Sequence, residues 1–411
     1  MRKNIWIINH YGEPPTVGKY TRHYKFASEL IKRGYNVRIF TSSAIHRTNI
    51  NYINNKSEYL EQEIEGVPFV FVKTCNYEGN GKNRVINMFQ YATRVLKVTK
   101  KFEKPDVIYA SSPHPLTWLA GYKIAKRCNA KFIAETRDMW PETLVAMEAI
   151  SENSIPARIL YKIEKYIYKN ADRLIFTMSG GKDYIKDKSW ENQIDLNKVN
   201  HINNGIDLEE YNKNIIMYQI NDSDVLNDEV FKVMYAGALG EANMVITILE
   251  AAKELQYIGI EDIKFLIYGS GYLEEKLKEY IQENNLKNVY FKGKVEKKYV
   301  PYILSRGQLN IIVGKDSYLY KYGFSQNKFF DYLASGKPII SNRDCHKILD
   351  ELKCGLTVEG ESPEALAEGI LKFYSMPKEE YDIYCKNASE IAQDYDFKVL
   401  TDKLEGVILE D

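Results

Sequence analysis

A short stretch in the last third of the chain combines turn residues, a cation and a carboxylate at helical spacing. Ser325 and Asn327 are typical turn or cap residues, and residues 328–335 are expected to form a short helix. Free backbone N–H groups at the start of such a helix favour a phosphate. Lys328 adds a cation there, and Asp331, one turn further on, can accept hydrogen bonds from ribose hydroxyls. The stretch therefore predicts a clamp for a nucleoside diphosphate.

Apolar strands alternate with helices along almost the whole chain. The first series of expected strands comprises residues 5–8, 37–41, 69–72, 107–110, 132–135, 173–178 and 198–202. The second series comprises residues 231–236, 264–268, 289–292, 309–313, 338–341 and 355–358. This alternation predicts the α/β class, with two doubly wound Rossmann-like domains of parallel strands.

The division into domains follows from the length and from a polar break. A chain of 411 residues is too long for one ordinary core. We expect a first domain at residues 1–208, a linker at 209–230 and a second domain at 231–394. A last helix at residues 395–411 could return to the first domain. Within the first domain, the polar and asparagine-rich residues 42–66 are expected to form a loop.

The charges are distributed unevenly although the net charge is zero. Residues 1–190 hold 31 Lys and Arg against 18 Asp and Glu, whereas the rest of the chain holds 25 against 38. A basic first half indicates an anionic partner. The aromatic residues carry no RNA-binding signature, so an anionic membrane or a lipid-phosphate substrate is preferred over a nucleic acid.

The spacing of the cysteines indicates whether they could bind a metal, and the cysteine content and hydropathy indicate the cellular compartment. The five cysteines are scattered without metal-like spacing, and this is typical of buried thiols in a reducing compartment. The chain shows no signal peptide and no apolar run of about 18 residues. We therefore expect a cytoplasmic protein, at most peripheral to a membrane.

Residues 82–104 form a distinctive basic and amphipathic segment. Apolar residues recur on one broad side, and a single acid, Glu103, stands among many cations. The cations expected to face a membrane are Arg94, Lys97, Lys100 and Lys101. This pattern is typical of interfacial membrane binding, on the inner face of the plasma membrane. The alternative is a helix packed on its own sheet with a basic face in solvent.

Several motifs occur in an order that resembles a known family. They are Asn204–Leu208, Tyr235–Gly237, Ile267–Gly271, Val289–Gly293 and Asn327–Ile340. Their order and spacing resemble family-4 retaining glycosyltransferases. The start of the chain around His10 and the segment Arg137–Glu142 look like the fucosaminyltransferase-like branch of capsule and O-antigen synthesis. The resemblance implies the GT-B fold, in which an acceptor-side first domain and a nucleotide-sugar-binding second domain face each other across a cleft.

The resemblance also implies a donor site. The residues that it places there are Gly18, Gly237, Gly240, Ser270, Gly271, Lys294, Val295, Ser325, Asn327, Lys328 and Asp331. Glycines at such contacts let the backbone approach the donor phosphates. Lys294 and Val295 stand where the family holds the nucleobase. Asp331 matches the second acid of the family's Glu-x7-Glu motif, which holds the ribose.

Two departures from the family pattern concern charge. The first acid of the Glu-x7-Glu motif, which contacts the donor sugar, is replaced by Gly323. The Arg and Lys that the family usually supplies after the first strand of the second domain are absent from Gly237–Asn243. A diphosphate still needs cations or N–H groups. Lys328 is the best candidate replacement, followed by Lys315 and Lys321.

The candidate catalytic residues follow first-domain strands, at the sheet edge where open α/β sheets bind ligands. Asp138 and Glu142 are expected to organise the acceptor or donor sugar, Arg137 is a possible phosphate partner, and His114 is a further candidate. The alternative for each carboxylate is a helix cap or a salt bridge. The alternative for His114 is a structural turn histidine.

The function that the resemblance implies is transfer of a sugar from a nucleotide-sugar, expected to be a UDP-sugar, to a lipid-linked saccharide in bacterial surface polysaccharide synthesis. The resemblance implies no cofactor and no metal, because GT-B enzymes generally need no bound metal. Two alternatives stay open. One is a sugar-nucleotide 2-epimerase of the same fold, and the other is a non-catalytic nucleotide-sugar-binding subunit.

Overall fold

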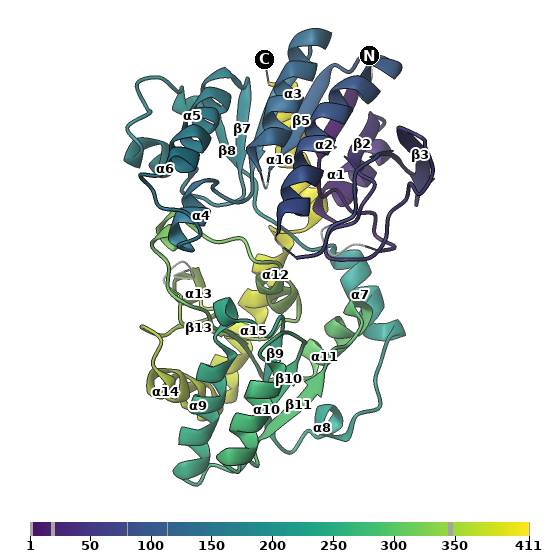
Figure 1. The fold of residues 1–411 in the computed structure, drawn as a ribbon. Helices are drawn as coiled ribbons and strands as arrows, with labels where there is room; N and C mark the ends of the chain where they lie inside the picture. Colours follow the sequence, from purple (N-terminus) through teal and green to yellow (C-terminus); the bar gives the residue numbers. More distant parts are fainter. Residues whose placement is uncertain (1–2, 18–20, 80, 113, 344–347, 411) are drawn as a thin grey trace. The chain divides into compact units, whose positions relative to one another are not determined.

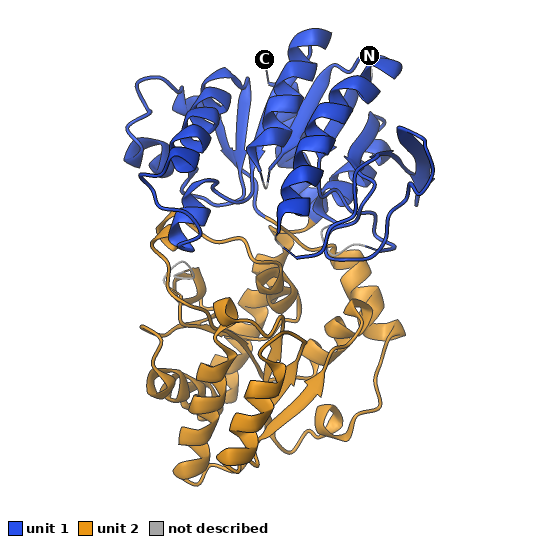
Figure 2. Cartoon of the chain, in the orientation of Figure 1, with its two compact units in different colours: residues 1–203, 397–411 blue, residues 204–396 orange. Residues whose placement is uncertain are grey.

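Two compact units make up the part of the chain that the computed structural model describes, which is residues 3–17, 21–79, 81–112, 114–343 and 348–410 (Figure 1). The first unit contains residues 1–203 and 397–411, and the second contains residues 204–396 (Figure 2). Parallel strands alternate with helices in both, as the sequence pattern predicts.

The sheet of the first unit has eight strands within the described residues, in the order β3-β4-β2-β1-β5-β6-β7-β8. The strands are β1 (Asn4–Asn9), β2 (Asn36–Ser42), β3 (Tyr59–Ile64), β4 (Val67–Val72), β5 (Val107–Ser111), β6 (Lys131–Thr136), β7 (Arg173–Phe176) and β8 (Val199–His201). All neighbours pair in parallel except β3, which pairs antiparallel with β4. The expectation of a loop throughout residues 42–66 is therefore wrong. β3 is an edge strand with mostly exposed side chains, so it lacks the apolar pattern of a buried strand.

Helices connect the strands of the first unit. They are α1 (Arg22–Lys32), α2 (Lys82–Val98), α3 (Pro115–Cys128), α4 (Glu142–Ala146), α5 (Ile155–Asn170), α6 (Gly181–Asp187) and α16 (Phe397–Leu409). α16 comes from the far end of the chain and packs on α1, where the rings of Phe26 and Phe397 meet edge to face at 5.5 Å. Leu400 and Leu404 are buried in the same core. The last helix of the chain is thus part of the first unit.

The sheet of the second unit has six parallel strands within the described residues, in the order β11-β10-β9-β12-β13-β14. They are β9 (Phe231–Ala236), β10 (Ile263–Tyr268), β11 (Val289–Gly293), β12 (Leu309–Ile312), β13 (Ile339–Ser341) and β14 (Gly355–Thr357). Its helices are α7 (Leu208–Met217), α8 (Ser223–Leu226), α9 (Val245–Tyr257), α10 (Glu274–Glu283), α11 (Val300–Ser305), α12 (Asn327–Ala334), α13 (Ile348–Glu351), α14 (Pro363–Tyr374) and α15 (Lys378–Gln393).

The segment expected to be a linker, residues 209–230, belongs to the second unit and contains most of α7 and all of α8. Asp207 caps α7 by accepting the backbone N–H of Glu210 at 2.9 Å. Tyr211 and Val225 are buried in the core of this unit. Few apolar residues suffice to hold these short helices, and this explains why the sequence reads as polar and irregular.

No helix among the described residues is both long enough and apolar enough to cross a membrane.

Candidate functional site

Two glycine turns lie together at the carboxyl edge of the second sheet. The turn after β9 is bonded to the turn after β10, because the N–H of Leu239 donates to the carbonyl of Ser270 at 3.1 Å. A Cβ on Gly271 would lie 2.1 Å from the carbonyl oxygen of Leu239, and one on Gly240 would lie 3.2 Å from the ring of Tyr272. Residue 271 must therefore be a glycine for the two turns to pack together, whether or not it also contacts a ligand.

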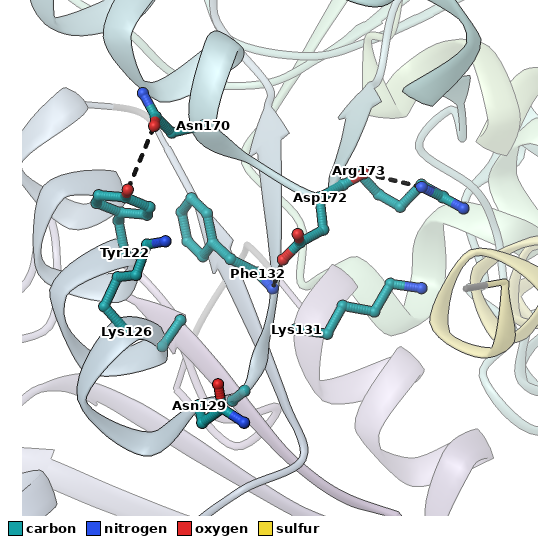
Figure 3. Close-up of a pocket in the computed structure, with 10 residues that line it drawn as sticks. Tyr122, Lys126, Asn129, Lys131, Phe132, Asn170, Asp172 and Arg173 are labelled. Atoms are coloured by element: carbon teal, nitrogen blue, oxygen red, sulfur yellow. Dashed lines mark hydrogen bonds between the residues drawn. The ribbon is translucent and has the colours of Figure 1, made fainter.

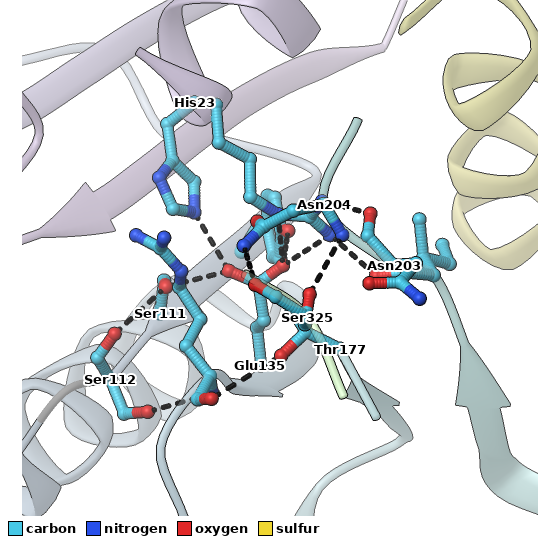
Figure 4. Close-up of polar contacts among 12 residues, drawn as sticks. His23, Ser111, Ser112, Glu135, Thr177, Asn203, Asn204 and Ser325 are labelled. Carbon is cyan, nitrogen blue, oxygen red and sulfur yellow. Dashed lines mark hydrogen bonds and ion pairs between the residues drawn. The ribbon is translucent and has the colours of Figure 1, made fainter. Parts of the chain in front are cut away.

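The loop before α12 is fixed to the chain that enters the second unit. Asn204 donates its backbone N–H to the Ser325 hydroxyl at 3.1 Å and its side-chain amide to the Ser325 carbonyl at 2.8 Å (Figure 4). Gln326 is the residue before α12, and its buried Oε1 has no hydrogen-bond partner within the described ranges. Asn327, the first helical residue, is exposed. The helix start is thus held in place while its first N–H groups are not capped by a side chain.

Lys328 extends from α12 to the turn after β9. Its ammonium donates to Asn243 Oδ1 at 2.7 Å and lies 4.9 Å from the ring centre of Tyr235. A Cβ on Gly237 would lie 3.2 Å from the same nitrogen, so this glycine leaves room for the cation. Burial, and then the charge of Arg343, lower the pKa of Lys328 to about 7.

Asp331 lies one turn after Lys328 and therefore shares its helix face. Its side chain is 14% exposed, and the nearest cation is the Lys297 ammonium at 4.0 Å. Burial raises the pKa of this carboxyl. Val295 is half-buried against the core, whereas Lys294 is exposed. The carboxylate of Asp331 thus keeps acceptor capacity for a ligand.

Arg343 is a residue that the sequence reasoning missed. It follows β13 and its guanidinium is buried beside the turn after β9, where Nη2 donates to the carbonyl of Ala242 at 3.2 Å. The guanidinium lies over the ring of Tyr320 at 4.3 Å. A Cβ on Gly314 would lie 1.4 Å from Nη2, so a side chain there would displace the guanidinium. The sequence signal for this pair was a glycine just after β12, Gly314, and an arginine just after β13, the next strand.

The other candidate donor residues have simpler surroundings. Lys315 and Lys321 are exposed. Gly323, at the position of the missing acid, has a φ of 102°, a backbone conformation that favours glycine over any acid. Gly18 lies outside the described residues.

A buried carboxylate organises the carboxyl edge of the first sheet. Glu135, at the end of β6, is fully buried and pairs with Arg22 Nη2 at 2.8 Å and His23 Nε2 at 2.8 Å (Figure 4). The hydroxyl of Ser111 donates to it at 2.6 Å, and the hydroxyl of Tyr109 donates as well. Sequence reasoning treated Glu135 only as the end of an apolar strand, although an acid there signals a buried charge.

The charges in this network balance. Burial alone would raise the pKa of Glu135, but the charge of Arg22 and the hydrogen bond from His23 hold it well below its usual range. Burial lowers the pKa of His23. The neutral ring of His23 then donates from Nε2 to Glu135 and accepts the Asn9 amide at Nδ1, 2.8 Å away. One anion, Glu135, is therefore paired with one cation, Arg22.

His114 belongs to a second buried group, in which it forms a hydrogen bond from Nε2 to His10 Nδ1 at 2.8 Å. His10 Nε2 in turn contacts the Asn87 amide oxygen at 2.5 Å. Burial lowers the pKa of His10 to about 3 and that of His114 well below its usual range. Both rings are thus neutral at physiological pH, and the geometry favours the structural alternative for His114.

The segment Arg137–Glu142 divides into two environments. Asp138 is exposed, and Arg137 is half-buried with a buried Nε for which the described residues offer no partner. Glu142, the first residue of α4, forms an ion pair with Lys188 and accepts the Tyr161 hydroxyl at 2.5 Å. The salt-bridge alternative therefore describes Glu142, and Asp138 is the carboxylate that a ligand can reach.

The basic segment at 82–104 forms α2 and a short turn after it. Val85, Ile86 and Phe89 are about half exposed on the first two turns of α2. Among the four expected membrane-facing cations, Lys97, Lys100 and Lys101 are exposed, whereas Arg94 is half-buried. Two of the four have protein partners, because Arg94 donates to the Lys73 carbonyl at 2.7 Å and Lys101 pairs with Glu58 at 2.6 Å.

A pocket of about 600 Å³ lies at the opposite, amino-terminal edge of the first sheet (Figure 3). Lys131 and Arg173 line it, but their cations are already used by the end of the chain. Lys131 donates to the carbonyl of Val407 at 2.8 Å, and Arg173 pairs with Glu410 at 3.1 Å. This pocket therefore helps to seat α16. The described part of the chain contains no group of three or more potential metal-ligating acids, histidines or cysteines.

Comparisons with known proteins identify both units. Residues 21–210 match the family described as Glycosyltransferase Family 4, and residues 230–376 match Glycosyl transferases group 1. The chain is 21% identical over 318 residues to the probable glycosyltransferase WbjE of Pseudomonas aeruginosa, covering 74% of this chain and 76% of WbjE. It is 27% identical over 155 residues to the putative colanic acid biosynthesis glycosyl transferase WcaI of Escherichia coli, covering 36% of each.

The fold has a wide set of solved relatives. HepE of Anabaena, solved in complex with UDP and glucose, superposes with a TM-score of 0.65 at 13% identity, covering 98% of this chain and 99% of HepE. At this identity the likeness shows the fold, and the prediction of a GT-B fold is confirmed. The chain therefore carries a glycosyltransferase family 4 domain followed by a glycosyltransferase group 1 domain, on a GT-B fold.

Proposed function

We propose that this protein is a retaining glycosyltransferase that moves a sugar from a UDP-sugar to a lipid-linked saccharide in the synthesis of a bacterial surface polysaccharide. The observation that carries the proposal is the uncapped start of α12, with Lys328 and Asp331 on one face. This arrangement suits a nucleoside diphosphate, with N–H groups and a cation for the phosphates and a carboxylate for the ribose. HepE is solved in complex with UDP, and this supports the choice of donor. The name of WcaI refers to colanic acid biosynthesis, and this supports the class of pathway.

The proposed chemistry is a front-face displacement. The acceptor oxygen forms its bond to the sugar C1 on the face that the phosphate oxygen leaves, and the acceptor proton passes to that phosphate oxygen. UDP is then the leaving group. The protein needs no nucleophile in this scheme, because alignment and charge stabilisation supply the catalysis. The cations of the second unit rather than a bound metal would stabilise the charge on the leaving diphosphate.

On the first unit, we assign contact with the acceptor or donor sugar to Asp138 and a phosphate contact to Arg137. Glu142 and His114 have buried partners of their own, so we assign them a supporting role in shaping this edge. The Glu135 network would hold α1 and the strand ends in place beneath these residues.

The membrane-facing surface of the proposal is the exposed side of α2. Val85, Ile86 and Phe89 offer apolar contacts, and Lys97 and Lys100 offer charge to anionic lipids. A surface of this kind would keep the enzyme beside a lipid-linked acceptor.

The direct test combines the purified protein, a panel of UDP-sugars and lipid-linked acceptors, with UDP release as the readout. We expect UDP release that depends on the acceptor, together with a product whose anomeric configuration matches that of the donor. Formation of a 2-epimer without acceptor would contradict the proposal and favour an epimerase. Tight UDP binding with no transfer to any acceptor would favour a non-catalytic subunit.

The membrane surface has a separate test by co-sedimentation with anionic phosphatidylglycerol vesicles. We expect binding that weakens with salt, and that falls when Lys97 and Lys100 are changed to Glu. The matched control reverses Lys372, which is exposed on α14 of the second unit, and should leave binding unchanged. Equal sedimentation of both variants would contradict this surface.

A further inference from the structure

A buried arginine in the second unit is short of partners. The side chain of Arg343 is 3% exposed, yet its guanidinium makes one hydrogen bond within the described residues, from Nη2 to the Ala242 carbonyl. Its Nε and Nη1 are buried and have no acceptor in the part of the chain that the structure describes. Buried polar groups are nearly always hydrogen-bonded, and an unmet charged donor is costly. A cost of this kind indicates a ligand that the site is built to receive.

The guanidinium is held in a fixed position by packing rather than by an acid. It lies against the rings of Tyr320 and Phe324, 4.3 and 5.6 Å from their centres, and against the backbone of Gly314. Among the described residues, no carboxylate forms an ion pair with Arg343. The side chain is therefore positioned before any ligand binds, so its N–H groups need little rearrangement.

A second cation stands close to the first. Lys328 also lacks a carboxylate partner within the described part of the chain, and donates to Asn243, the residue next to Ala242. The two side chains thus meet the same short turn after β9 from different elements. Two adjacent cations without an acid repel each other, and an anion placed beside both would relieve that repulsion.

The position in the fold favours a ligand of the sheet edge. Arg343 follows β13, Gly314 follows β12, and Ala242 belongs to the turn after β9, so the group gathers at the carboxyl ends of three neighbouring strands. This edge is where open α/β sheets bind their ligands. The turn after β9 also lacks the Arg and Lys that its family resemblance would place there.

We propose that Arg343 and Lys328 form a two-cation site for an oxyanion of the donor, namely its diphosphate, with Arg343 supplied from β13 in place of the absent pair. This inference rests on the proposed function, because it takes a nucleotide-sugar as the ligand. The planar guanidinium carries several N–H donors that suit a phosphate, and those on Nε and Nη1 are left open within the described residues.

The test is calorimetric titration of the native protein and of Arg343→Gln with UDP and with uridine. We expect the substitution to weaken UDP binding by about 10- to 100-fold, because a charge-assisted contact is lost. Uridine binding should be weak and equal in both proteins. The matched control is Arg306→Gln, which removes a charge already paired with Asp228 at 3.0 Å and should leave UDP binding unchanged.

A second titrant separates two sources of the same oxyanion chemistry. A sugar carboxylate could occupy the guanidinium in place of a phosphate, so UDP-glucuronic acid and UDP-glucose are titrated as well. Equal losses for UDP, UDP-glucose and UDP-glucuronic acid support the diphosphate. A loss confined to UDP-glucuronic acid would overturn it and would assign Arg343 to the sugar.

Thermal unfolding adds a readout that a purely structural arginine would not give. Without ligand, Arg343→Gln should melt at or above the native temperature, because an unpaired buried charge is removed. The rise in melting temperature that UDP causes should shrink. A lower melting temperature with unchanged UDP affinity would overturn the inference. If the native protein binds no UDP, the proposed function fails. If the native protein binds UDP and Arg343→Gln binds it with the same affinity, only the assignment of Arg343 fails.

Discussion

Buried charge is handled in opposite ways at the carboxyl edges of the two sheets. In the first unit Glu135 is fully buried and has partners on both oxygens, from α1 and β5. In the second unit Arg343 is almost as buried, but two of its nitrogen atoms have no acceptor among the described residues. The first arrangement is complete without a ligand, whereas the second becomes complete only when an anion arrives. The difference separates a charge that maintains the fold from a charge reserved for binding.

The same difference sets what each region does for the fold. The Glu135 network joins residues that are distant in the sequence, since Arg22 also donates to the Ile202 carbonyl at 2.8 Å. It therefore ties α1 to β6 and to the end of β8. Arg343 contacts mainly aromatic rings and a glycine, which pack equally well around a neutral side chain. Substitutions at the two sites should consequently act on different quantities.

The largest effect is expected for Glu135→Gln. The substitution leaves Arg22 as an uncompensated buried charge, so the free energy of unfolding of the first unit should fall by about 3–5 kcal/mol. All four tryptophans, at positions 6, 118, 140 and 190, lie in the first unit, so tryptophan fluorescence during urea unfolding reports on that unit. The control is Glu61→Gln, which breaks the exposed pair with Arg38 and should cost about 0–1 kcal/mol. Similar losses of unfolding free energy in Glu135→Gln and Glu61→Gln would show that the buried pair stabilises the fold no more than the exposed pair does.

Asp331→Asn should change binding rather than stability. The carboxylate has Lys297 at 4.0 Å as its nearest cation, and burial already raises its pKa, so little folding energy depends on its charge. Calorimetry should show UDP affinity reduced by about tenfold, which corresponds to about 1.4 kcal/mol. A large drop in melting temperature with unchanged UDP affinity would show that Asp331, like Glu135, stabilises the fold and does not bind the ligand.

The affinity for UDP should depend on pH through Lys328. Its pKa is about 7 in the folded protein, lowered by burial and Arg343, and its other close neighbours are Tyr235 and Asn243. Below pH 7 the ammonium is charged and binds the anion; above pH 7 the amine becomes neutral. We expect UDP affinity to fall by about 3- to 10-fold between pH 7 and pH 8.

Stability should move in the opposite direction over that range. The unfolded chain retains the proton up to about pH 10.4, so between pH 7 and pH 10 the unfolded state binds more protons and the contribution of Lys328 to stability rises with pH. Lys328→Gln should remove the pH dependence of binding. If the variant keeps the native pH profile, another group is responsible.

The smallest effect is expected from chelation. If Lys328 and Arg343 stabilise the diphosphate charge, then EDTA should change the rate of sugar transfer by less than about twofold. The appropriate control adds excess Mg²⁺ after EDTA treatment. A large loss of transfer rate that Mg²⁺ restores would show that Lys328 and Arg343 alone do not stabilise the diphosphate charge. It would also weaken the contrast between Glu135, which maintains the fold, and these two cations, which bind the ligand.

The fold was largely predictable because its signals are local. Alternating apolar strands and helices identify two α/β units, and the motif order predicts the GT-B fold. The errors concern segments whose order comes from few contacts. β3 has exposed side chains on an edge strand, and α7 and α8 are anchored by one or two buried residues each, such as Tyr211 and Val225.

The site was predictable only where one local segment carries it. The spacing of Lys328 and Asp331 follows from a single helix, so the sequence places them on one face. Arg343 acquires its environment from the neighbouring order of β12 and β13, which no local pattern reveals. Similarly, Glu135 ends an apolar strand, and its partners Arg22 and His23 are more than a hundred residues away.

The return of α16 makes the second unit an insertion within the first. During synthesis, the strands of the first sheet are made before the second unit, but Phe397, Leu400 and Leu404 of the same core follow only afterwards. The second unit can therefore complete its core while the first still exposes the face that α16 covers. We therefore expect the first unit, although most of it is translated first, to finish folding after the second.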